Sequence, residues 1–174
     1  VYGAFLKKLK KSALKKLTLK PVELYKNNQT QQVFNRDSNI LLKDITADIL
    51  YLDPPYNQRQ YSTNYHLLAT IARYDEPKIL GKTGLRSYKQ QKSLYCSKSK
   101  VKEIFKDLIL KAKAKYIFLS YNNEGLMSLK DIKEIMSLKG RYDYVTKNYN
   151  RYKADSHRNY KTDKTIEYLH YTVC

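Results

Sequence analysis

Alternating strand-like and helix-like segments from residue 31 onward constrain the fold of this chain more than any other feature. Strand-like segments at residues 31–37, 47–53 and 115–125, the last with a polar end, are each followed by a helix-like segment. The predicted helices cover residues 38–45, 63–74, 101–114 and 128–139, and residues 142–152 and 165–173 alternate like paired strands. This order predicts an α/β fold with a mostly parallel sheet and a C-terminal antiparallel hairpin.

The first 30 residues differ from the rest of the chain and are predicted to form a separate basic segment. Within residues 1–20, Leu6, Leu9 and Leu14 share one side of a helix and lysines occupy the other. Pro21 is predicted to end this helix. Such a helix is either a solvated surface element or the edge of a nucleic-acid groove. Residues 31–174 would then form the α/β domain.

Charge is the compositional feature with the clearest functional meaning. The chain has 34 Lys and Arg against 16 Asp and Glu, a formal net charge of +18, and it has 18 tyrosines. This excess predicts a polyanionic partner, and tyrosines among basic residues suit base stacking. The alternative is a Lys- and Tyr-rich composition imposed by an AT-rich genome.

Two further classes of site or partner are not expected from the composition. The cysteines, Cys96 and Cys174, lie far apart and match no metal-ligand spacing, which favours reduced thiols in a cytoplasmic protein without a metal site. No apolar run approaches the roughly 20 residues of a membrane-spanning helix, so no membrane partner is expected.

The segment "ILYLDPPY" places polar chemistry directly after a predicted buried strand. In such a sheet, the strand ends at 35–37, 53–56 and 120–123 are expected to face one site. Pro54 and Pro55 have no backbone N–H, so the local carbonyls are available as acceptors, together with the carboxylate of Asp53. Tyr56 adds a flat ring. The segment therefore predicts a site for a planar base with an exocyclic amino group, and a structural Pro-Pro turn capped by Asp is the alternative.

These residues resemble the catalytic motif of Dam-like adenine-specific DNA methyltransferases from restriction–modification systems. The resemblance runs along the whole chain and includes "YLDPPYNQRQYSTNYHLL", "GKTGLRSYKQQKS", "AKYIFLSYNNEG" and "EYLHY". It implies a Rossmann-like methyltransferase sheet, S-adenosylmethionine as methyl donor, DNA as partner, a bacterial cytoplasmic location and functional pairing with a restriction endonuclease. The four residues Asp-Pro-Pro-Tyr at positions 53–56, taken alone, also occur in methylases that act on RNA and on protein amides.

The resemblance also implies roles for individual residues. Asp53 and the carbonyl of Pro54, in a motif completed by Pro55, would accept hydrogen bonds from the adenine amino group next to the cofactor methyl. Tyr56 would stack on an adenine flipped out of the duplex. Asp37 would contact the adenine moiety of the cofactor. The wall of the base pocket is assigned to Ser120, Tyr121 and Asn122.

Nucleic-acid contacts are predicted in two basic loops. In the glycine-containing loop at residues 75–100 the candidates are Lys82, Arg86, Lys89 and Lys92. In the hairpin loop they are Arg151, Lys153 and Arg158, with a solvated loop as the alternative. The "GKTG" at residues 81–84 lacks the spacing of a phosphate-binding P-loop, and His66 is expected to be a packed or surface histidine.

One departure from the family pattern limits these expectations. A complete enzyme of this class carries a Phe-x-Gly-x-Gly motif after its first strand, and the glycines here, at positions 3, 81, 84, 125 and 140, do not form it. We therefore expect a C-terminal portion that lacks the first strands, binds S-adenosylmethionine weakly alone, and needs an N-terminal portion or a complementing chain. An RNA adenine methyltransferase and a catalytically silent nucleic-acid-binding module remain as alternatives.

Overall fold

A computed structural model of the chain describes residues 11–16, 18–150 and 164–174. Its strands are β1 (Thr46–Leu52), β2 (Lys113–Asn122), β3 (Arg141–Asn150) and β4 (Lys164–Val173). Its α-helices are α1 (Ser38–Leu41), α2 (Tyr61–Asn64), α3 (His66–Arg73), α4 (Val101–Lys111) and α5 (Leu129–Met136). Short 3₁₀ helices cover Lys11–Leu14, Lys89–Gln91 and Leu94–Cys96.

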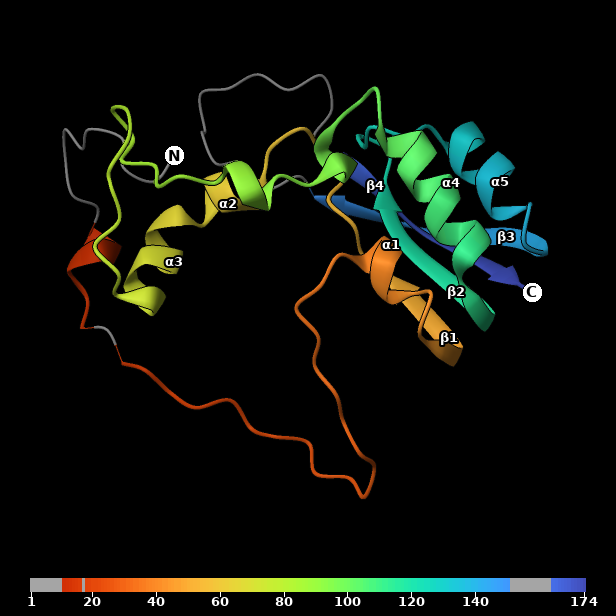
Figure 1. The fold of residues 1–174 in the computed structure, drawn as a ribbon, viewed down its shortest axis with the longest axis horizontal. Helices are drawn as coiled ribbons and strands as arrows, with labels where there is room; N and C mark the ends of the chain where they lie inside the picture. The colour runs from red at the N-terminus through yellow and green to blue at the C-terminus, as the bar shows by residue number, and fades with distance from the viewer. Residues whose placement is uncertain (1–10, 17, 151–163) are drawn as a thin grey trace.

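The four strands form one mixed sheet in the order β1–β2–β4–β3 (Figure 1). β1 and β2 run parallel, whereas β4 is antiparallel to both β2 and β3. The predicted C-terminal hairpin is therefore confirmed. Among the described strands, β1, β2 and β3 point in one direction. Only β4, which lies between β2 and its hairpin partner β3, points in the other, so the sheet is mixed.

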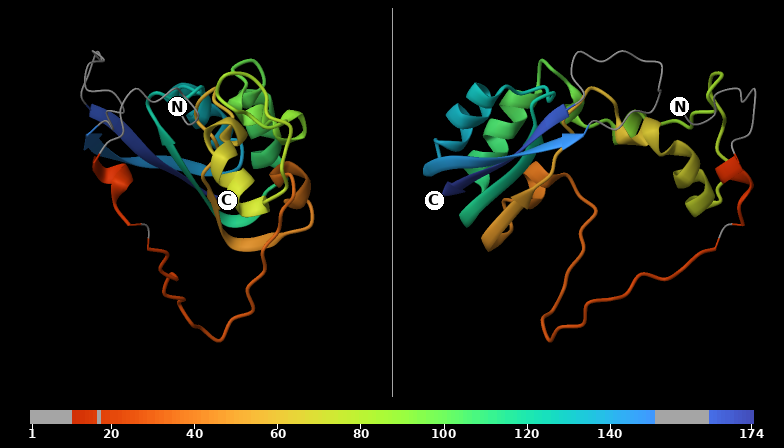
Figure 2. Two further views of the ribbon diagram at one scale, coloured as in Figure 1. Left: turned by 90° about the vertical axis from the view of Figure 1, so that its left-hand side faces the viewer. Right: turned by 180° about the vertical axis from the view of Figure 1, so that it is seen from behind.

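One face of the sheet carries the core, because α1, α4 and α5 lie over it (Figures 1 and 2). Alternate residues of β2, namely Ile117, Leu119 and Tyr121, point to this face and are buried. On α4, Phe105 and Ile109 follow each other at a spacing of four residues and are completely buried. The amphipathic patterns of residues 101–114 and 128–139 thus predict their helices correctly.

The opposite face of the sheet is not covered by any helix that the structure describes (Figure 2). The strand register aligns Ile49 of β1 with Tyr116 of β2 and Tyr116 with Val173 of β4. These three side chains are exposed, as are Tyr51 and Val145 on neighbouring positions of the same face. We call this surface the open sheet face; it is apolar and aromatic, unlike the usual solvated side of a sheet.

The N-terminal predictions hold least well. Residues 31–37 form no strand, and their side chains are exposed, because no neighbouring strand supplies the hydrogen bonds that a strand needs. Of the helix predicted at residues 1–20, positions 1–10 and 17 lie outside the described residues. The rest forms only the 3₁₀ turn Lys11–Leu14, and residues 18–37 run as an extended connection (Figure 1).

The segment after β1 leaves the sheet. The helix predicted at residues 63–74 is confirmed, with an interruption at Tyr65 that separates α2 from α3. α3 lies away from the sheet (Figure 1) and ends at Tyr74, which has the left-handed φ of 51°. The long loop predicted after it is also present; it contains an isolated bridge between Leu80 and Leu85 and the two 3₁₀ helices at Lys89–Gln91 and Leu94–Cys96.

A buried histidine makes the stability of this fold dependent on pH. His170 of β4 stacks on Tyr168, and its Nδ1 lies 2.8 Å from the hydroxyl of Tyr142. Burial lowers the pKa of His170 from 6.5 to about 4. The imidazole of His170 therefore binds a proton at higher pH in the unfolded chain than in the folded one. The folded state keeps its full stability above pH 6.5, and the contribution of His170 to the free energy of unfolding is lost as the pH falls to about 4.

We expect acidification from pH 7 to pH 4 to lower the free energy of unfolding by about 3 kcal/mol through His170 alone. Urea denaturation at a series of pH values measures this change. The His170→Phe variant keeps a ring beside Tyr168 but cannot be protonated, and so should lose most of the slope between pH 6.5 and pH 4.5. An equal slope in both proteins would contradict the assignment.

Candidate active site at the carboxyl ends of β1 and β2

The segment Asp53–Tyr56 lies where the parallel strands β1 and β2 end side by side. Leu52, the last residue of β1, is aligned with Leu119, so the motif follows β1 next to Ser120. The carbonyl oxygen of Tyr56 accepts a hydrogen bond of 2.9 Å from the backbone N–H of Leu126, in the loop after β2. The expected meeting of these two strand ends is therefore confirmed.

On one side of the motif, a cavity of about 550 Å³ brings three of the predicted base-pocket residues together. Tyr56, Ser120 and Asn122 all line it. The remaining lining residues come from the β2–α5 loop and from the ends of β3 and β4 nearest the hairpin loop: Glu124, Tyr149, Asn150, Thr165 and Glu167. We call it the Tyr56 cavity. Its aromatic ring and several amide, hydroxyl and carboxylate groups suit a planar polar ligand.

Tyr121 does not line the Tyr56 cavity, which corrects its assignment to the pocket wall. Its side chain points to the helix-covered face and is only 1% exposed. The hydroxyl oxygen accepts hydrogen bonds from the N–H groups of Leu126 (3.1 Å) and Met127 (3.3 Å). Its ring meets that of Tyr56 edge to face, at 6.4 Å between centroids and 82°. The buried ring of Tyr121 therefore packs against the ring of Tyr56. Burial raises the pKa of the Tyr121 phenol.

On the other side of the motif, a second cavity of about 350 Å³ is lined by Asp53, Pro54 and Pro55. We call it the Asp53 cavity. Its polar wall comes from residues 38 and 93, and its apolar and aromatic wall from Tyr51, Leu52, Tyr95, Phe105 and Leu108. Asp53 thus offers a carboxylate next to apolar and aromatic surface, at the edge of the sheet where β1 has no outer neighbour among the described strands.

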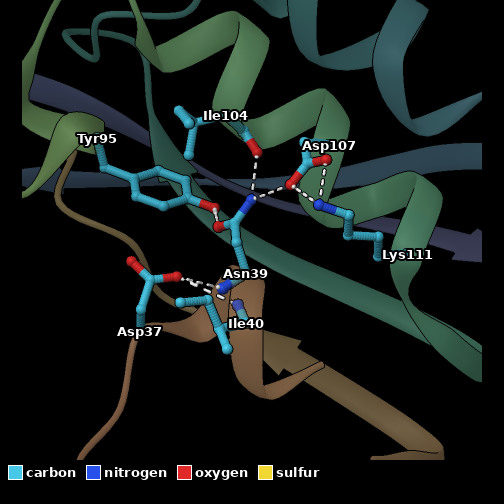
Figure 3. A network of polar contacts seen from close by, with 7 residues as sticks. All are labelled: Asp37, Asn39, Ile40, Tyr95, Ile104, Asp107 and Lys111. Carbon is cyan, nitrogen blue, oxygen red and sulfur yellow. Dashed lines mark hydrogen bonds and ion pairs between the residues drawn. The ribbon is translucent and has the colours of Figure 1, made fainter. Parts of the chain in front are cut away.

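Asp37 begins α1 beside the Asp53 cavity, and its observed role is that of a helix cap. Its Oδ1 accepts hydrogen bonds from the N–H groups of Asn39 (2.9 Å) and Ile40 (3.2 Å) (Figure 3). The N-cap of α1 is therefore Asp37, and Ser38 is the first residue of the helix. Ser38 lines the cavity. The cap holds the first turn of α1 in place next to Asp53.

A hydrogen-bond network that the sequence does not reveal fixes α1 against α4 (Figure 3). The side-chain amide of Asn39 donates to the carbonyl of Ile104 (2.9 Å) and to the carboxylate of Asp107 (2.8 Å). Tyr95 donates its hydroxyl to Asn39 at 2.9 Å, and burial raises the pKa of this phenol. Hydrogen bonding to Lys111 lowers the pKa of Asp107. The partners lie more than 50 residues apart in the chain, so no local pattern indicates them.

The predicted nucleic-acid contacts fall into three groups. Lys82, Lys89 and Lys92 are exposed, as phosphate contacts require. Arg86 is 8% exposed and donates to both carboxylate oxygens of Asp75, at 2.9 and 2.5 Å, which corrects its assignment as an exposed DNA contact. These hydrogen bonds lower the pKa of Asp75. Arg151, Lys153 and Arg158 lie outside the described residues.

The described part of the chain contains neither a candidate metal cluster nor a candidate membrane-spanning helix. Residues 11–16, 18–150 and 164–174 contain no group of three or more His, Cys, Asp or Glu side chains that could hold a metal ion. Over the same ranges, no helix is both long and apolar enough to cross a membrane.

Comparison with known proteins agrees with the geometry of the motif. Residues 1–138 match the family model of the D12 class N6 adenine-specific DNA methyltransferases. The chain is 56% identical over 172 residues to the Type II methyltransferase M.NlaIII of Neisseria lactamica, covering 98% of this chain and 51% of that protein. No solved structure gives a significant match.

Two other relatives show the same pattern of coverage. The chain is 44% identical to the Type II methyltransferase M.FokI of Planomicrobium okeanokoites, over 98% of this chain and 26% of that protein. It is 40% identical to M.CviAII of Paramecium bursaria Chlorella virus 1, over 88% of this chain and 46% of that protein. The chain thus spans about half, or less, of the length of these relatives. With most of its length matched by the family model, the chain belongs to the D12 class of N6 adenine-specific DNA methyltransferases.

Proposed function

We propose that this chain carries the base-binding half of a site-specific DNA adenine methyltransferase, which methylates the exocyclic amino group of an adenine flipped out of the duplex. The observation that carries the proposal is the position of Asp53–Tyr56 between two cavities. The Tyr56 cavity offers a ring and polar groups for the base. The Asp53 cavity offers a carboxylate and apolar surface for the methyl donor.

Catalysis by these residues rests on positioning. The carboxylate of Asp53 and the carbonyl of Pro54 accept hydrogen bonds from the amino group and orient its nitrogen, while Tyr56 stacks on the base and Pro55 holds the backbone shape. Ser120 and Asn122 line the rest of the cavity. S-adenosylmethionine, when bound, would supply the methyl group: a nitrogen–carbon bond would form as the sulfur–carbon bond breaks, and one amino proton would pass to solvent. Holding the two reactants in contact accounts for much of the rate enhancement.

The residues around the Asp53 cavity fit part of S-adenosylmethionine. Asp53 provides a carboxylate for its polar groups, and Tyr95 and Phe105 provide surface for its apolar and aromatic parts. Asp37, which does not line the cavity but directly precedes Ser38 of its wall, is proposed as a second carboxylate for the donor. The chain has no Phe-x-Gly-x-Gly segment that would let the backbone approach the donor closely. We therefore propose that another portion of polypeptide completes the donor site.

Two features of the sheet support the proposal that another portion of polypeptide packs against this chain and completes the methyl-donor site. β1 forms an edge of the described sheet, and Ile49 and Tyr51 on it are about 60% exposed. Parallel strands are ordinarily covered on both faces, whereas no helix among the described residues covers the apolar open sheet face. The completing portion is proposed to lie N-terminal to this segment or on a separate chain.

Charge supports DNA as the substrate. The formal net charge is +18, and Lys82, Lys89 and Lys92 extend into solvent from the loop at residues 75–100. Arg151, Lys153 and Arg158 are proposed as further phosphate contacts on their sequence position alone. The names of the relatives also favour a modification enzyme that is paired with a restriction endonuclease.

Methyl transfer from tritium-labelled S-adenosylmethionine tests the proposed function. The protein is expressed from its whole reading frame and incubated with unmethylated DNA, and the digested product is analysed for N6-methyladenine. We expect labelled N6-methyladenine in DNA and none in RNA. Transfer to RNA alone would identify an RNA methyltransferase, and DNA binding without any transfer would identify a silent binding module; either result overturns the proposal.

A further inference from the structure

A stacked pair of tyrosines lies next to the motif and has no role in the function proposed above. Tyr61 opens α2 and Tyr65 follows four residues later, so the two side chains share one side of the chain. Their ring centroids are 5.7 Å apart and the ring planes differ by 20°. Tyr61 remains 55% exposed and Tyr65 48% exposed. The pair therefore presents flat aromatic surface to solvent.

Hydrogen bonds of Gln60, which lies between the motif and Tyr61 in the chain, hold the pair beside the motif. The side-chain amide of Gln60 donates to the carbonyl of Ser93 (3.1 Å) and accepts from its N–H (2.8 Å). Ser93 itself lines the Asp53 cavity. This two-way contact fixes the residue before Tyr61 against the wall of the candidate active site. Burial and then the nearby charge of Asp53 raise the pKa of Tyr61, in agreement with this placement.

The surroundings of the pair favour a nucleobase as its ligand. Arg59, two residues before Tyr61, is exposed, and the chain as a whole carries a large positive charge. Flipping an adenine out of a duplex leaves its former partner and its neighbours without their normal stacking contacts, close to the enzyme's motif. Exposed tyrosine rings beside cations are the surface on which single-stranded bases stack.

We propose that Tyr61 and Tyr65 form a stacking platform for a second nucleobase of the DNA, distinct from the adenine in the Tyr56 cavity. This inference rests on the proposed function only in taking DNA as the ligand. The base lies against the exposed face of the pair, and Arg59 contacts the adjoining phosphate. The platform holds the opened strand beside the motif while the target adenine occupies its cavity.

Binding of short single-stranded oligodeoxynucleotides to the full chain, followed by fluorescence anisotropy, tests the platform. One oligonucleotide carries bases, and a second of equal length carries abasic residues. The Tyr61→Ala/Tyr65→Ala double variant should bind the base-carrying strand about tenfold or more weakly, because stacking contributes about 1–3 kcal/mol per base. Its affinity for the abasic strand should equal that of the unmodified protein, since the phosphate contacts are intact.

Two control variants separate stacking from folding. Tyr61→Phe/Tyr65→Phe keeps both rings and should retain full affinity for the base-carrying strand. Tyr74→Ala removes an exposed tyrosine at the far end of α3 and should change neither affinity. Alanine favours helix, so the double variant should keep its circular dichroism spectrum.

Equal binding of the base-carrying strand by the double alanine variant and the unmodified protein would overturn the platform, as would equal losses on both strands. The measurement involves no methyl transfer. A failure of the proposed enzymatic function would therefore leave its result standing, and a failure of the platform would leave methyl transfer intact.

Discussion

Replacement of Asp53 by alanine is expected to reduce methyl transfer to DNA by about a hundredfold or more, the usual effect of removing a positioned acceptor or donor from a reacting centre. The carboxylate lies directly after β1 and lines the Asp53 cavity, and Tyr56 of the same motif lines the Tyr56 cavity. Without it, the carbonyl of Pro54 remains as the only motif acceptor proposed for the amino group, and the nitrogen is no longer oriented towards the methyl donor. Transfer of labelled methyl groups in single-turnover conditions measures the loss.

Affinity for DNA should change little in the same variant, because phosphate contacts by exposed cations such as Lys82 and Lys89 dominate binding. Asp53→Asn keeps one carbonyl acceptor and should retain more activity than Asp53→Ala. The matched control is Asp48→Ala in the same strand, which removes an exposed ion pair with Lys115 and should leave the transfer rate unchanged. Transfer at the original rate by Asp53→Ala would refute the catalytic assignment.

Replacement of Gly125 by alanine is expected to disturb both the fold and the site. A Cβ at this position would lie 2.1 Å from a ring carbon of Tyr121. Since Tyr121 is fully buried, its ring cannot swing into solvent, and either the ring or the loop after β2 must move. Overpacking of this kind costs about 1–3 kcal/mol, and the weakened hydrogen bonds to Leu126 and Met127 add to it.

The shift should also reach the candidate active site, because the ring of Tyr56 rests edge to face on that of Tyr121. We therefore expect Gly125→Ala to lower both the thermal midpoint and the rate of methyl transfer. Gly81→Ala is the matched control: its φ is +64° but no atom lies within 4 Å of the added carbon. It should cost only the strain of a left-handed alanine, about 1 kcal/mol, and should leave transfer unchanged. Equal effects of the two substitutions would contradict this coupling.

Local patterns predict much of this structure correctly where the deciding contacts are close in the chain. The amphipathic spacing on α4 and α5 indicates which sides are buried, and Ser128 forms a capping box with Asp131 at the start of α5. The alternation in β3 and β4 predicts their antiparallel hairpin. The apolar segment before Asp53 correctly predicts a strand that delivers this carboxylate to the end of the sheet.

Predictions fail where a distant partner decides the outcome. Residues 31–37 have the composition of a strand but form none, since a strand is stable only against a neighbour. Arg86 looks like an exposed cation in a basic loop, yet its side chain is largely buried and is paired with the carboxylate of Asp75, which is itself exposed. Tyr121 belongs to a strand end that faces the site, but the alternation of side chains across the sheet turns it to the other face.

The sequence alone therefore determined the chemistry: an aspartate, two prolines and a tyrosine after a strand, in a chain of high positive charge, because these depend on residue types and short spacings. Only the tertiary structure decided which groups share a cavity. It joined Tyr56 to Ser120 and Asn122 in one cavity and placed Tyr95, which is hydrogen-bonded to Asn39, in the same cavity as Asp53. It also stacked Tyr61 on Tyr65 beside the motif. The physical reason is that cavities and most of these contacts form between segments that are distant in the chain, and the packing of the sheet brings them together.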